Sequence, residues 1–122
     1  MRRLNSKEEQ IMQILWRLEH AFVKEIRAEM DEPRPPITTV SSIVRKLEGE
    51  GFIGHENFGK TYRYFPAVQQ EEYRKSTFRR LLDNYFGGSP RQLLSYFVEE
   101  EEVSPEELDD ILEEIRKKEE KE

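Results

Sequence analysis

The sequence predicts a mainly helical chain that contains a single small β-hairpin. Apolar residues recur at intervals of three and four over most of its length, which is the pattern of amphipathic helices. One stretch, residues 52–65, changes to the alternating pattern of extended strands. Glycine and proline residues separate these segments and indicate where each one ends.

Composition limits the kinds of protein that the chain can form. Its 122 residues fit one functional unit, and 38% of them are charged, so much of the chain must face water or a partner. The absence of cysteine excludes disulfides, thiolate metal sites and cysteine nucleophiles. No apolar stretch approaches the roughly 20 residues that cross a membrane, and residues 1–7 lack a signal-peptide core. We expect a cytoplasmic protein without membrane insertion.

Charge is divided unevenly along the chain. The net charge is −6, but residues 1–64 carry +1 and residues 65–122 carry −7. Attraction to phosphate depends on the local charge of the contacting face. The overall acidity therefore does not exclude nucleic acid as a partner of the first half.

Two helices are predicted before residue 33. Asn5 and Glu8 have the spacing of a capping box, and the first helix should run from Ser6 to Glu19. Its apolar stripe is Ile11, Ile14, Leu15 and Leu18. A shorter second helix should contain Val23, Ile26 and Met30 and end before Pro33, Pro35 and Pro36.

A third helix is predicted from about Thr38 to Leu47. Thr38 or Thr39 can cap it, and Gly49 and Gly51 can end it. Its inward stripe is Val40, Ile43, Val44 and Leu47. Its outward side chains are then Ser41, Ser42, Arg45 and Lys46.

A β-hairpin should follow, with strands at 52–56 and 61–65 and a turn at 57–60. Three helices and then a hairpin, with a polar outer face on the third helix, is the order of a winged helix-turn-helix domain. We assign residues 1–66 to this DNA-binding domain and residues 67–122 to a helical dimerisation domain.

Three more helices are predicted in the second domain. Gly87 and Gly88 should end the first, and Ser89-Pro90 and Ser104-Pro105 should start the next two. Their apolar stripes are Phe78, Leu81, Leu82, Tyr85, Leu93, Leu94, Phe97, Val98, Leu108, Ile111, Leu112 and Ile115. Since one chain can cover these stripes only in part, we expect a symmetric homodimer that pairs two recognition helices on double-stranded operator DNA.

Hydroxyl and cationic side chains are suited to contact bases and phosphates. The candidate DNA contacts are Thr38, Thr39, Ser41, Ser42, Arg45 and Lys46 on the third helix and Lys60 and Arg63 on the hairpin. Thr39 could instead only cap the helix, and the stem of Lys46 could cover apolar surface. A solvated hairpin tip is the alternative for Lys60 and Arg63.

No catalytic arrangement is evident. His20 and His55 lack a serine or carboxylate at a catalytic spacing, and no metal cluster or cofactor loop is present in the sequence. We therefore expect neither enzymatic activity nor a cofactor or metal. The alternative to DNA binding is a winged-helix module that binds a protein through the acidic second half.

Several motifs, spread over nearly the whole chain, resemble one known family. They are Leu4, Glu8-Glu9 and Leu15-Trp16; Ile37 to Ser42; Arg45-Lys46-Leu47; Gly51-Phe52-Ile53; Gly59 to Pro66; and Phe86-Gly87-Gly88-Ser89. Together they are similar to the penicillinase and methicillin-resistance repressors. The resemblance implies a dimeric winged-helix repressor of β-lactam-resistance or related genes.

The resemblance also implies a mechanism of release. In the family, a membrane sensor with a protease domain responds to β-lactam, and the repressor is cleaved between Asn and Phe in its dimerisation region. The matching bond here is Tyr96-Phe97, where tyrosine replaces asparagine, so the sequence favours a core role for Phe97 over cleavage. A copper-sensing branch uses a cysteine cluster that this sequence lacks.

Overall fold

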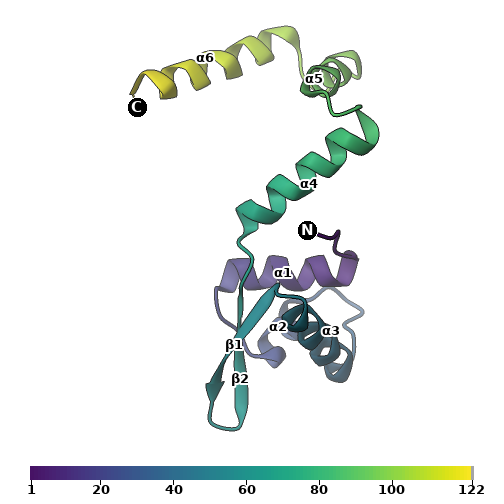
Figure 1. The fold of residues 1–122 in the computed structure, drawn as a ribbon, viewed down its shortest axis with the longest axis vertical. Coiled ribbons are helices and arrows are strands. Elements are labelled where there is room, and N and C mark those ends of the chain that lie inside the picture. Colours follow the sequence, from purple (N-terminus) through teal and green to yellow (C-terminus); the bar gives the residue numbers. More distant parts are fainter. Residues whose placement is uncertain (122) are drawn as a thin grey trace. The chain divides into compact units, whose positions relative to one another are not determined.

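The computed structural model describes residues 1–121, and Figure 1 shows the order of the elements. The helices are α1 (Ser6–Leu18), α2 (Val23–Glu29), α3 (Ile37–Gly49), α4 (Gln70–Tyr85), α5 (Pro90–Glu99) and α6 (Pro105–Lys121), and the strands are β1 (Ile53–Phe58) and β2 (Thr61–Pro66). This mainly helical fold with one antiparallel hairpin confirms the predicted fold class. The hairpin is called the wing below.

The chain divides into two compact units, Met1–Thr77 and Phe78–Glu122. The first contains the three helices and the wing together with the first half of α4. The division thus lies within α4, rather than just after the wing at residue 66, where the sequence analysis placed it. The assignment of one unit to DNA and the other to dimerisation stays a prediction.

The core of the first unit joins α1, α2, α3 and the base of the wing. Its fully buried members include Ile11, Leu15, Ile26, Val44 and Leu47, which lie on the inward stripes expected from the helical spacing. Burial of these apolar side chains is the main source of the stability of this unit. It fixes how α3 is held against the other two helices.

The segment after the wing also packs on this core. Tyr73 of α4 is 6% exposed, and its hydroxyl accepts a hydrogen bond of 3.0 Å from the backbone N–H of Leu4. The indole Nε1 of Trp16 donates to the carbonyl oxygen of Val68 at 2.8 Å. The start of α4 is therefore an integral part of the first unit.

The wing is longer than predicted. Its register pairs Ile53 with Pro66 and Phe58 with Thr61, so the strands include Asn57 and Phe58 and the turn is reduced to Gly59-Lys60. Gly59 has a φ of 60°, a conformation that favours glycine. Figure 1 shows the hairpin extending away from α1, α2 and α3. Its turn is thus open to a partner.

A third extended segment, which was not predicted, pairs with the wing. Ala21, in the connection between α1 and α2, forms an isolated antiparallel bridge with Tyr64. The Ala21 N–H donates to the Tyr64 carbonyl at 2.9 Å, and the Tyr64 N–H donates back at 2.8 Å. These two bonds attach β2 to the helical part of the unit.

Most of the predicted helix starts are confirmed. Asn5 and Glu8 form the reciprocal capping box, and the hydroxyls of Ser89 and Ser104 accept from the N–H groups of Gln92 and Glu107. The predicted cap of the third helix is wrong. Pro36 is the N-cap of α3, and its carbonyl accepts from the N–H of Thr39 at 3.0 Å, so Thr38 and Thr39 lie within the first turn.

Candidate DNA-binding surface

One face of α3 carries polar side chains and the other is part of the core. Val40, Val44 and Leu47 are completely buried, which orients the helix. The predicted contact residues Thr38, Ser42, Arg45 and Lys46 are exposed, and Thr39 and Ser41 are half-buried. With four hydroxyls and two cations outside the core, this face can donate to base edges and phosphates.

The two cations of the wing have different environments. Lys60 is exposed in the turn. The guanidinium of Arg63 lies 4.4 Å from the centre of the Phe58 ring and forms an ion pair of 3.3 Å with Glu56. The Nε of Arg63 is buried and, within the part of the chain that is described, has no hydrogen-bond partner. Lys60 is therefore the more accessible cation, whereas Arg63 is partly neutralised.

His55 connects the wing with α3. Its Nδ1 is hydrogen-bonded to the carboxylate of Glu48 near the end of α3, and its ring stacks on Tyr62 with the centroids 4.2 Å apart. Tyr62 remains 49% exposed, whereas Tyr64 is 5% exposed. Tyr64 therefore belongs to the core of the first unit, whereas Tyr62 does not. The contacts of His55 hold the wing in a defined position beside the polar face of α3.

A hollow lies between the start of α3, the start of α2 and the tip of the wing. Its lining residues are Phe22, Val23, Lys24, Glu25, Ile37, Ser41, Lys60, Thr61, Tyr62 and Tyr64. This lining brings Ser41 together with Lys60, although they come from different elements of the fold. It also contains Ile37, which was not predicted as a site residue. The sequence could have identified Ile37 by its position four residues before Ser41, because residues four apart lie on the same face of a helix.

A network of charges holds the C-terminal part of α3, and it was not predicted. Glu8 is only 1% exposed, and its carboxylate accepts from Arg2 Nη2 at 2.6 Å and Nη1 at 3.0 Å. Arg2 also donates to Glu50 at 2.9 Å, and Lys46 lies 3.3 Å from Glu8. We call Arg2, Glu8, Lys46 and Glu50 the Glu8 network. It joins the N-terminus and α1 to α3.

The hydrogen bonds of the Glu8 network lower the pKa values of its two carboxyl groups. Hydrogen bonds from Arg2 lower the pKa of Glu8 to about 2, although burial opposes the shift. Arg2 also lowers the pKa of Glu50. Glu8 is therefore ionised at neutral pH, and Lys46 faces a carboxylate as well as solvent. Capping-box spacing identified Glu8, but no local signal connects Arg2 with Glu50, which lies 48 residues away.

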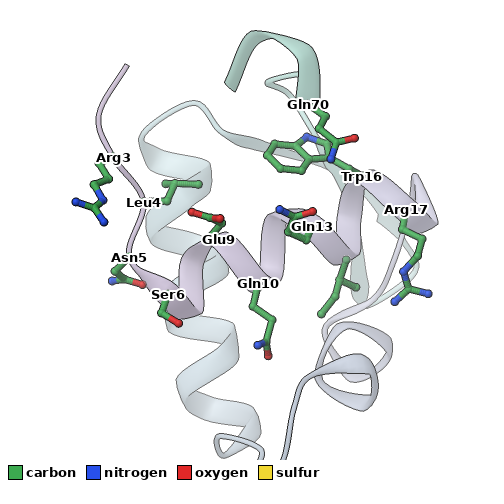
Figure 2. Close-up of a pocket in the computed structure, with 11 residues that line it drawn as sticks. Arg3, Leu4, Asn5, Ser6, Glu9, Gln10, Gln13, Trp16, Arg17 and Gln70 are labelled. Carbon is green, nitrogen blue, oxygen red and sulfur yellow. The ribbon is translucent and has the colours of Figure 1, made fainter. Parts of the chain in front are cut away.

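A second hollow runs along α1 and contains none of the predicted contact residues (Figure 2). Gln10, Gln13 and Arg17 line it, with Trp16 and Gln70 close together at one end. The side-chain amide of Gln10 donates a hydrogen bond of 3.0 Å to the carboxylate of Asp31. Among residues 1–121 no three His, Cys, Asp or Glu side chains are grouped to hold a metal ion. We therefore place the candidate site at α3 and the wing.

The second unit leaves most of its predicted stripes exposed. Of the candidate dimerisation residues, only Leu82 and Leu93 are buried, and Val98 and Leu108 are half-buried. The exposed ones are Phe78, Leu81, Tyr85, Leu94, Phe97, Ile111, Leu112 and Ile115. Tyr96 and Phe97 lie inside α5 and are 48% and 38% exposed. No described helix is both long and apolar enough to cross a membrane.

Comparison with known proteins assigns this arrangement to a family. Residues 4–117 match the model of the penicillinase repressor family. The chain is 24% identical over 116 residues to the methicillin resistance regulatory protein MecI of Mammaliicoccus sciuri, covering 94% of both chains. It is 22% identical over 109 residues to the penicillinase repressor of Bacillus licheniformis, covering 88% of this chain and 85% of that one. The chain is therefore a member of the penicillinase repressor family, a family of transcriptional repressors.

Proposed function

We propose that the protein is a sequence-specific repressor that binds a palindromic operator as a homodimer and controls β-lactam-resistance or related genes. The observation that carries this proposal is the polar outer face of α3, on which Ser42 and Arg45 are exposed and Ser41 shares a hollow with the wing. Its relatives are named for resistance to methicillin and for penicillinase, which suggests the class of regulated gene.

The roles of individual residues follow from their exposure. Ser41, Ser42 and Arg45 would read base edges from α3, with Thr38 and Thr39 beside them in the first turn. Lys60 would contact phosphate from the tip of the wing. Lys46 and Arg63 are already paired with carboxylates, so we assign them a smaller share of the affinity.

The test is an affinity series on DNA recovered from the genome of the source organism. Ser42→Ala and Arg45→Ala should each weaken binding to the recovered site by about tenfold, since a good base contact is worth about 1–3 kcal/mol. Arg17→Ala is the matched control, because Arg17 is an exposed arginine on α1 outside this surface. Equal binding to recovered and scrambled duplexes would refute the proposal.

Dimerisation is supported by the exposed apolar side chains of the second unit. Ile111, Leu112 and Ile115 of α6 are 42%, 41% and 48% exposed, and such a stripe is typical of a surface that a second copy covers. Leu112→Asp should shift the protein towards monomer in sedimentation equilibrium, whereas the neighbouring Glu113→Ala should not. A monomeric wild-type protein at the concentration that saturates the operator would contradict the dimer.

Release by proteolysis within the second unit is part of the proposal, with a membrane sensor-protease or another protease as the partner. Because Tyr96 and Phe97 lie in the middle of α5, a protease would have to open this helix to reach the bond. Mass spectrometry of the repressor from β-lactam-treated cells should show a fragment that ends within this unit. An intact chain in induced cells would exclude proteolytic release.

The two α3 variants, Ser42→Ala and Arg45→Ala, also distinguish the proposed repressor from a protein-binding module. If the acidic second half bound a protein partner and DNA were irrelevant, Ser42→Ala and Arg45→Ala would leave the regulated genes unchanged in cells. Under the proposed function, both variants should raise expression of these genes.

A further inference from the structure

An apolar side chain borders the polar surface proposed to contact DNA. Ile37 is the first residue of α3 and is 40% exposed. Side chains four residues apart share a helix face, so Ile37 lies beside Ser41, and both line the hollow that faces the wing. Across this hollow is Tyr62, which is 49% exposed.

The position of Ile37 on α3 explains why the core does not cover it. Residues seven apart return to nearly the same side of a helix, so Ile37 continues the row of Val44. Val44 is completely buried, whereas Ile37 lies two turns nearer the start of the helix, where the hollow replaces the core. Its side chain is therefore available to a molecule that docks on α3.

The chemistry of the major groove limits what an aliphatic side chain can recognise there. Recognition helices contact base edges chiefly with their N-terminal residues, and Ile37 is at that end of α3. It offers no hydrogen bond. The C5 methyl group of thymine is the apolar group that the bases present in the major groove.

We propose that Ile37 contacts the methyl group of one thymine in each operator half-site and is a specificity-determining residue. This inference rests on the proposed function, in which α3 reads operator DNA. Ile37 would distinguish thymine from cytosine at a position where Ser41 and Arg45 serve neighbouring bases. Its contribution is one of apolar burial and should depend little on salt.

The test removes one methyl group at a time from the DNA. In the recovered operator, each thymine is replaced singly by deoxyuridine, which keeps the pairing edge and lacks the methyl. For the wild-type protein, the single replacement at one thymine position of either half-site should weaken binding by about fourfold, the effect of removing one buried carbon. For Ile37→Ala, the same replacement should have no effect on affinity.

Two further variants make the result specific. Ile37→Val keeps both γ-carbons, loses only the δ-methyl group, and should retain most of the sensitivity to deoxyuridine. Thr38→Ala changes the neighbouring exposed residue and should lower affinity while leaving that sensitivity unchanged. Circular dichroism compares the folding of each variant with that of the wild type.

The outcomes separate this inference from the function on which it rests. If the wild-type protein selects an operator but no thymine methyl affects binding, the role of Ile37 is wrong and the repressor function stands. The same holds if deoxyuridine weakens the binding of Ile37→Ala as much as that of the wild type, so that the variant loses affinity equally for the thymine and the deoxyuridine duplexes. If the wild type prefers no duplex, both proposals fail.

Discussion

Replacement of Glu8 by glutamine tests whether the Glu8 network stabilises the first unit. The substitution preserves the size of the side chain but removes its charge. The carboxylate accepts two hydrogen bonds from Arg2, at 2.6 and 3.0 Å, and one of 2.9 Å from the N–H of Asn5. Hydrogen bonds to charged groups contribute about 1.5–3 kcal/mol each, but the exposure of Arg2 and its second partner Glu50 reduce the loss. We expect Glu8→Gln to lower the free energy of unfolding by about 1.5–3 kcal/mol at pH 7.

The pH dependence gives this prediction a sign. The pKa of Glu8 is lowered from 4.5 to about 2 in the folded protein. The unfolded chain therefore binds a proton at higher pH than the folded chain does, and the contribution of Glu8 is complete above pH 4.5 and lost as the pH falls towards 2. Glutamine has no such proton. The difference between wild type and Glu8→Gln should thus be largest near neutrality and shrink in acid.

Urea unfolding at fixed protein concentration, followed by circular dichroism between about pH 7 and pH 3, measures this difference. Glu9→Gln is the matched control, since Glu9 is the next residue of α1 and its carboxylate is outside the Glu8 network. Our interpretation would be refuted if Glu8→Gln lowered the free energy of unfolding by the same amount at the neutral and the acidic end of this pH range. It would also be refuted if Glu9→Gln showed the same pH-dependent loss.

Three further predictions concern other parts of the chain. Tyr73→Phe removes the acceptor of the buried Leu4 N–H and should lower the free energy of unfolding by about 1–3 kcal/mol in urea; no loss would mean that the N–H finds another partner. Ser89→Ala removes the cap of α5 and should cost about 1 kcal/mol in the same assay, whereas Ser95→Ala, inside the helix, should cost less. Lys60→Ala should reduce the slope of log affinity against log salt by about 1, and an unchanged slope would remove Lys60 from the phosphate contacts.

Local signals in the sequence were sufficient to predict most of the secondary structure. The capping box of Asn5 and the serine caps of α5 and α6 involve residues only three positions apart, so the sequence shows both partners together. The same holds for the polar face of α3, because the spacing of Val40, Val44 and Leu47 determines which residues point away from the core. The start of α3 was placed one residue late, since the backbone carbonyl of Pro36 closes its first turn and no side chain caps it.

By itself, the sequence determined the helices, the wing and the outward position of Ser42 and Arg45, because these depend on periodicity and on neighbours within about four residues. Only the tertiary structure decided which distant groups meet. Packing brings Arg2 to Glu50, places Tyr73 on the core of the first unit, and ends that core before Ile37. These outcomes depend on contacts between residues tens of positions apart, where no spacing along the chain distinguishes a partner from a solvated side chain.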